Sequence, residues 1–198
     1  MEYSIQKRAE RILNACLRCE SSDAAAIFYQ VAAMDFVRIH GPEHHILDGA
    51  CLLTICRNAG WPIDLPAALR RMREEGLRMP GAACGLWGVC GAASSVGAAL
   101  AILDGTGPLT EDGSWDAHMH CTAAALSDIA AVNGPRCCKR DALIALRAGT
   151  DYLRNTHKIP VSCEIRPCGF FSENEQCIGT RCPFYPQKEG SHPVPFSL

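Results

Sequence analysis

The stretch that decides the fold is 81–105, GAACGLWGVCGAASSVGAALAILDG. It belongs to a run of 25 residues, 79–103, that carries no charge and is rich in Gly and Ala. Side chains this small let neighbouring helices approach closely. We therefore predict a buried central helix here, and Cys84 and Cys90 with their glycines mark its N-terminal end as a site.

The composition bounds the class of protein. A length of 198 residues is typical of one domain. The net charge of −2 gives no overall positive field that would attract nucleic acid or anionic membranes. The uncharged run could span a bilayer by length, but its five glycines, two serines and one proline make it poorly hydrophobic. We expect no nucleic-acid or membrane partner.

Thirteen cysteines are the strongest compositional signal. The first residues are charged and lack an apolar core, so we expect no signal peptide and a cytoplasmic protein. In a reducing compartment, clustered cysteines indicate metal or redox chemistry rather than disulfides.

Hydrophobic periodicity predicts an all-α fold, a single helical domain around the central helix. The domain should cover 1–159, and an irregular, cysteine-rich, metal-binding tail should cover 160–198 and pack on it. Besides the central one, helices are expected at 4–19, 24–37, 46–57, 66–75, 115–132 and 136–155. Asp23 or Ser22, Asp64 and Ser114 are the expected caps.

Two cysteine groups lie where helices should begin, Cys84-x5-Cys90 and Cys137-Cys138. Helix N-termini and nearby cations lower a thiol's pKa, and thiolates are the metal ligands. Arg136, Lys139 and Arg140 surround the adjacent pair. We expect the two helix starts to converge and hold an anionic [4Fe–4S] cluster, with one of the adjacent cysteines as ligand and the other supporting it or reacting.

The tail carries four more cysteines, spaced x4, x8 and x4: Cys163, Cys168, Cys177 and Cys182. A short segment without its own core needs a cross-link, which in a reducing compartment is a metal. The spacing leaves an iron–sulfur cluster and a zinc ion as alternatives. Of the remaining cysteines, the pair at 16 and 19 and the pair at 51 and 56 are best explained as core residues. His40, His44 and His45 precede an apolar helix and could face a site, with His44 or His45 moving protons.

The chain resembles an uncharacterised cysteine-rich family, a domain of unknown function found mainly in anaerobic bacteria and methanogenic archaea. The resemblance covers most of 40–185 and rests on four segments: HHILDGACLLTICRNAG (44–60), CGLWGVCGAASSVGAALAI (84–102), NGPRCCKRDALIAL (133–146) and NEQCIGTRCPF (174–184). It implies a metal role for Cys84, Cys90, Cys137, Cys138, Cys177 and Cys182. In some members the domain accompanies radical-SAM or methyltransferase-like modules, which implies such a partner.

A looser likeness is to the catalytic domains of iron–sulfur L-serine dehydratases and cysteine desulfidases. In those enzymes three cysteines hold a [4Fe–4S] cluster whose open iron is a Lewis acid. The corresponding order here would be Cys90, Cys121 and Cys137 or Cys138, although the spacings differ.

Two functions compete on these observations. One is an iron–sulfur protein whose open iron acts on sulfide, a thiol or a small anion, in sulfur mobilisation or lyase chemistry. The other is a non-catalytic module, stabilised by zinc or a cluster, that docks onto a radical-SAM or methyltransferase partner. A homodimer is the oligomeric state that we consider.

Overall fold

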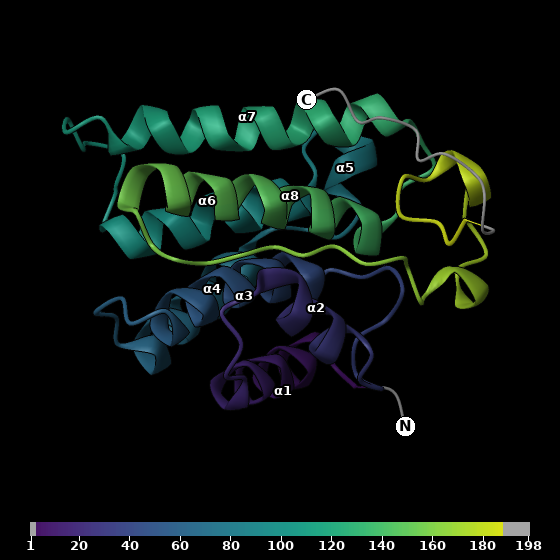
Figure 1. Ribbon diagram of the computed structural model, residues 1–198, viewed down its shortest axis with the longest axis horizontal. Helices are drawn as coiled ribbons and strands as arrows, with labels where there is room; N and C mark the ends of the chain where they lie inside the picture. Colours follow the sequence, from purple (N-terminus) through teal and green to yellow (C-terminus); the bar gives the residue numbers. More distant parts are fainter. Residues whose placement is uncertain (1–2, 188–198) are drawn as a thin grey trace.

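The structure, a computed structural model, describes residues 3–187, and the predicted all-α class is confirmed (Figure 1). No β-strand occurs within that range. The part of the predicted tail at 188–198 lies outside the described residues. The described helices are α1 (Ile5–Arg18), α2 (Ala24–Ala32), α3 (His44–Asn58), α4 (Leu65–Arg78), α5 (Ala83–Leu86), α6 (Gly91–Asp104), α7 (Ser114–Val132) and α8 (Cys138–Tyr152), followed by a π-helical turn at Leu153–His157 and 3-10 turns at Phe171–Glu173 and Gly179–Arg181.

Helix α3 occupies the centre of the packing. It contacts α1, α2, α4, α6 and α8, and 12 of its 15 residues are buried. Figure 1 shows α7 on one side, α6 and α8 beneath it, and α1 to α4 on the other side. Helix α6, which the Gly/Ala stretch forms, is central beside α3, because it contacts α3, α4, α7 and α8.

The stretch 81–105 is also interrupted, where we expected one continuous helix. It forms the single turn α5 and the longer α6, separated at 87–90. Ala82 and Gly88 both take positive φ, at 65° and 69°. Glycine weakens a helix interior and takes this backbone form without strain, so the glycine-rich end turns instead of continuing. The break separates Cys84 and Cys90 onto two helix starts.

The polar caps follow the sequence closely. The side chains of Ser4, Asp23 and Asp64 accept hydrogen bonds from the amides of Lys7, Ala26 and Ala67. Gly113, not Ser114, precedes α7. Helix α2 ends at Ala32, five residues before the predicted boundary, and the Lys139 ammonium donates to the Ala32 carbonyl at 2.9 Å.

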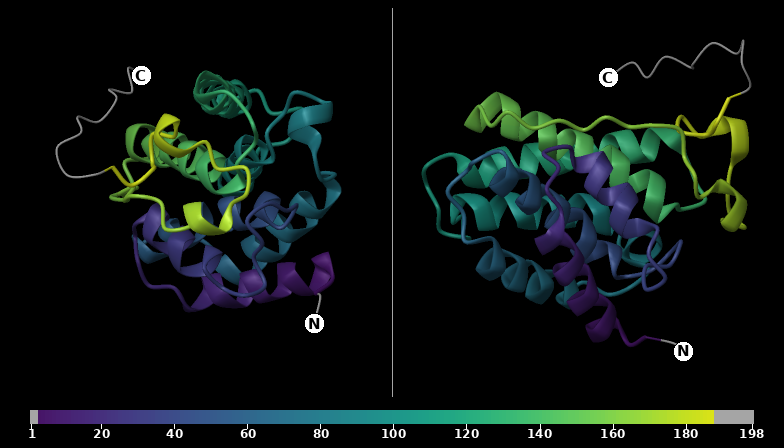
Figure 2. Two further views of the ribbon diagram at one scale, coloured as in Figure 1. Left: turned by 90° about the vertical axis from the view of Figure 1, so that its right-hand side faces the viewer. Right: turned by 60° about the horizontal axis from the view of Figure 1, so that its bottom comes forward.

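The chain after α8 returns along the molecule. From Lys158 it runs extended beside α8 and comes back to the end where α8 began (Figures 1 and 2). Hydrogen bonds pin it on the way: Ser162 N donates to Ser22 O, Ala24 N to Ser162 O, and Tyr29 Oη to Arg166 O. A 15-residue helix rises about 22 Å, which about seven extended residues can retrace. The tail cysteines are thereby returned to the start of α8.

Within the described residues, no helix combines the length and apolar character needed to cross a membrane.

The crossing of α3 and α6 leaves no room for a methyl group at Gly49. A Cβ there would overlap the Met72 sulfur and the backbone oxygen of Ser95, and Gly49 N donates to Ser95 Oγ at 2.8 Å. We expect Gly49→Ala to destabilise the fold by about 1–3 kcal/mol, because the backbone must shift. Urea unfolding would measure this. Gly85→Ala, at a helical position with open space around it, is the control and should stay within about 0.5 kcal/mol; equal effects would contradict the packing argument.

Candidate functional site

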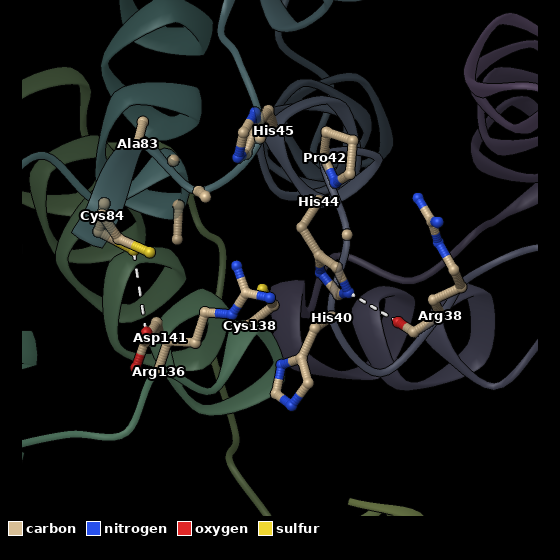
Figure 3. A pocket seen from close by; sticks show the side chains of 16 residues that line it. Arg38, His40, Pro42, His44, His45, Ala83, Cys84, Arg136, Cys138 and Asp141 are labelled. Atoms are coloured by element: carbon tan, nitrogen blue, oxygen red, sulfur yellow. Dashed lines mark hydrogen bonds between the residues drawn. The ribbon is translucent and has the colours of Figure 1, made fainter. Parts of the chain in front are cut away.

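Four helix starts meet at one end of the molecule and enclose a pocket of about 300 Å³ (Figure 3). We name it the three-thiol pocket, after Cys84 of α5, Cys90 before α6 and Cys138 at the start of α8. His44 and His45 at the start of α3 also line it. The amino ends of α3, α6 and α8 therefore point to one place, where their dipoles favour negative charge.

The prediction that helix starts and nearby cations lower the pKa of these thiols was wrong. Burial raises the pKa of Cys90 and of Cys138 to about 12, and raises that of Cys137 as well. The expected lowering by helix starts and cations is outweighed, because the thiols lose more hydration than those charges return. In the metal-free protein they are thiols, and Cys90 Sγ donates to Asp141 Oδ2 at 3.9 Å.

Only one of the three predicted cations reaches the three-thiol pocket. Arg136 lines it and is exposed. Arg140 is buried, donating to Asp141 Oδ1 at 2.9 Å and to Pro135 O at 3.2 Å. Lys139 is 1% exposed and stands over the Phe170 ring. These last two side chains support the start of α8 from the other side.

The two predicted proton-transfer histidines differ in how they are held. His44 Nε2 donates to Arg38 O at 3.1 Å, whereas its Nδ1 is buried without a hydrogen-bond partner among the described residues, 3.6 Å from Asp48 Oδ1. Asp48 is fully buried, and burial raises its pKa.

His45 has a ring nitrogen available. Its Nδ1 donates to Met79 O at 3.3 Å, and Nε2 has no hydrogen-bond partner in the part of the chain described. Burial lowers the pKa of His45, so the ring is neutral and Nε2 carries a lone pair at neutral pH. Gly91 is required beside it, because a Cβ there would overlap the ring. His45 is the better proton acceptor of the two.

A second group of cysteines surrounds a cavity of about 20 Å³ on the other side of the α8 start. We name it the four-thiol cavity; its cysteines are Cys137, Cys168, Cys177 and Cys182. The adjacent Cys137 and Cys138 therefore face different cavities. The sequence had instead suggested that both belong to one site. The predicted set Cys84, Cys90, Cys137 and Cys138 is divided between the two.

Several cysteines lie outside both cavities. Cys163, predicted to join the tail group, lies beside the Ala25 amide and Asp23, where α2 begins. Cys121, which the dehydratase likeness would need, is buried on α7 and lines neither cavity. The cysteines at 16, 19, 51 and 56 are buried in the core, as predicted.

The spacing of the donors limits what they can hold as they stand. All thirteen cysteines are free thiols. Among the described residues, no three Cys, His, Asp or Glu side chains are placed to hold a single metal ion. The thiols of the three-thiol pocket stand around 300 Å³, which suits a group larger than one ion.

Three residues near these cavities escaped the prediction of site residues: Asp48, Asp141 and Asn174. His40, which the sequence offered as a residue that could face a site, lines the three-thiol pocket. His40 Nε2 donates to Asn174 Oδ1 at 2.9 Å, and its Nδ1 is buried without a hydrogen-bond partner. Asp48 and Asp141 sit in helical patterns that also suit surface carboxylates. A polar residue such as Asn174, buried within an irregular segment, leaves no periodic signal in the sequence.

Comparison with known proteins places the chain in a family. Searches among curated proteins and among solved structures found no match. A family model described as "Family of unknown function (DUF5714)" matches residues 12–185, a range that includes every cysteine of both cavities. The chain thus belongs to the DUF5714 family.

Proposed function

We propose that the protein is an iron–sulfur protein whose three-thiol pocket holds a [4Fe–4S] cluster through Cys84, Cys90 and Cys138. The observation that carries this is the convergence of three thiols and three helix amino ends on one pocket. Three thiolates leave one iron of such a cluster without a protein ligand. The function that follows is binding, and chemistry, of sulfide, a thiol or a small anion at that position.

The donor set fits this group. The thiols come from three separate segments and line one pocket. The pocket they line is about 300 Å³, which leaves room for a small ligand besides. A bound cluster supplies a Lewis-acidic iron, and its binding displaces the thiol protons.

The chain's own residues then have distinct tasks. Arg136 lies at the exposed side of the pocket, where it can attract an anionic ligand. Asp141 Oδ2 accepts a hydrogen bond from Cys90, so it can receive the proton that this thiol releases. His45 Nε2 is the atom we assign to remove a proton from a bound thiol or hydroxy-acid.

The test is analysis of iron and acid-labile sulfide in protein purified without oxygen. We expect a brown protein, and a change in its visible spectrum when sulfide, a thiol or a small anion is added. Cys84→Ser and Cys90→Ser should each remove that response, and Cys90→Ser keeps a good N-cap residue before α6. Cys163→Ser is the matched control, because it is half-buried but lines neither cavity.

A spectral response to sulfide, a thiol or a small anion that survives in both variants would overturn the assignment. A colourless protein that holds only zinc would overturn the enzymatic proposal. It would favour the second candidate, a non-catalytic module that docks onto a radical-SAM or methyltransferase partner. One observation favours that candidate: Leu86 and Trp87, directly after Cys84, are 77% and 64% exposed. Such apolar exposure beside a metal site is suited to a protein partner.

A further inference from the structure

We propose that the four-thiol cavity is a second, separate metal centre, in which Cys137, Cys168, Cys177 and Cys182 bind a zinc ion or an iron–sulfur cluster. This centre fastens the returning C-terminal segment to the start of α8. It does not depend on the proposed function, because it uses none of the cysteines of the three-thiol pocket.

The first support is convergence from distant parts of the chain. Cys137 precedes α8, and the other three cysteines follow the return segment. The backbone closes this arrangement, since Cys168 N donates to Phe184 O at 2.6 Å. The four thiols are half-buried and line one cavity, but as they stand they are not placed around a single ion. Binding would therefore require rotation about their Cα–Cβ bonds.

The second support is a repeated local geometry. Cys168-Gly169-Phe170 and Cys182-Pro183-Phe184 both place the amide of the phenylalanine against the preceding thiol. Cys137 receives two such donors, from Arg140 N and Asn174 Nδ2, each at 3.5 Å. N–H groups directed at sulfur stabilise a thiolate and position it as a ligand.

The third support is charge. Lys139 and Arg140 are buried and line the cavity. Among the described residues, no carboxylate lies within ion-pair distance of the Lys139 ammonium, whose hydrogen bond goes to Ala32 O. A buried cation without a counter-charge is costly. Four thiolates around a dication carry a net negative charge, which offsets that cost whether the centre holds zinc or a cluster.

The fourth support is the weakness of the segment without a cross-link. Between Pro167 and Gln187 the only regular structure is two short 3-10 turns, and Asn174 is the one buried residue. Such a segment buries too little apolar surface to hold itself in place. A metal tying it to Cys137 supplies the missing constraint.

The test measures metal in the full-length protein carrying one substitution at a time. Cys137→Ser, Cys168→Ser, Cys177→Ser and Cys182→Ser should each lose the same centre, while Cys163→Ser keeps it. Cys137→Ser preserves the cap of α8, so its loss would reflect the ligand. Iron with acid-labile sulfide identifies a cluster. A colourless protein with zinc, which cobalt can replace to give thiolate charge-transfer bands, identifies the single ion.

Hydrogen exchange provides a second measurement. Removing this metal should increase exchange at 168–185 while the amides of α3 and α6 stay protected. Equal metal loss in Cys163→Ser and Cys168→Ser, or full metal retention in Cys137→Ser, would overturn the proposal. The proposed function fails separately, since Cys84→Ser and Cys90→Ser report only on the three-thiol pocket.

Asn174 gives a prediction for a supporting residue. Its Nδ2 donates to Cys137 and its Oδ1 accepts from His40 Nε2 and from Gln176 N. We expect Asn174→Ala to weaken metal retention by roughly 10–100-fold, the usual effect of losing an outer hydrogen bond to a ligand. Competition with a chelator would measure the change. Glu175→Ala, next to it and exposed, is the control, and equal retention in both variants would contradict this role.

Discussion

Cys138→Ser is expected to lose the proposed iron of the three-thiol pocket and to keep the proposed metal of the four-thiol cavity. Cys137→Ser is expected to do the reverse. The two residues are adjacent, but Cys138 lines one cavity and Cys137 the other. A serine hydroxyl is a much weaker metal ligand than a thiolate at neutral pH, so each substitution should remove most of the metal of one centre.

Metal analysis of the two variants and the double variant decides the matter. Because the centres use different ligands, the double variant should lose both metals. Identical metal loss in the two single variants would mean that one shared centre exists, as the sequence alone suggested. Circular dichroism checks that α8 remains, since serine at 137 can still cap it.

The second large effect concerns the loop that carries the histidines. Glu43 is completely buried and accepts hydrogen bonds from Arg38 N, Nε and Nη2 at 2.8–3.0 Å, with Arg8 at 3.9 Å. We expect Glu43→Gln to destabilise the protein by about 3 kcal/mol at pH 7, because the buried Arg8 and the partly exposed Arg38 lose their counter-charge. The value is at the lower end of the range for buried pairs, since the Arg38 side chain is 44% exposed.

The same carboxylate should make stability depend on acid pH. Burial alone would raise the pKa of Glu43, but the hydrogen bonds from Arg38 outweigh it and lower the pKa. Its contribution is thus present above the unfolded pKa, about 4.3, and is lost as the pH falls through the folded pKa. The difference between wild type and Glu43→Gln should therefore shrink in acid.

Urea unfolding at pH 7 and in acid, in a matched metal state, measures both effects. Glu75→Gln is the control, because Glu75 pairs with Arg71 and Arg78 on the surface of α4. It should cost no more than about 1 kcal/mol. A Glu43→Gln variant that loses no more stability than this control would contradict the buried role.

The sequence predicted local structure well, because short-range rules decide it. Asp23 and Asp64 cap their helices as expected, and apolar periodicity located the helices to within a few residues. It did not locate the break in the Gly/Ala stretch between α5 and α6, because glycine permits both a helix and a turn.

The cysteines show a different limit. Spacing groups residues that are near in sequence. Cys163 was therefore assigned to the tail group, and Cys137 was assigned to the same site as Cys138. The return of the chain after α8 changes both assignments, because it brings 168–182 to Cys137 and leaves Cys163 beside α2. Which of two adjacent residues faces which cavity depends on backbone direction at the helix start, and spacing alone does not encode it.

The adjacency of Cys137 and Cys138 has a thermodynamic consequence. A metal in either cavity would restrict the same few backbone dihedrals at the start of α8. The first metal to bind would therefore bear the entropic cost of ordering that turn, and the second metal would bind to a turn that is already ordered. Filling one centre would then tighten the other by a coupling free energy that is equal in both directions. Loading would be cooperative, and partly metallated chains would be scarce during assembly.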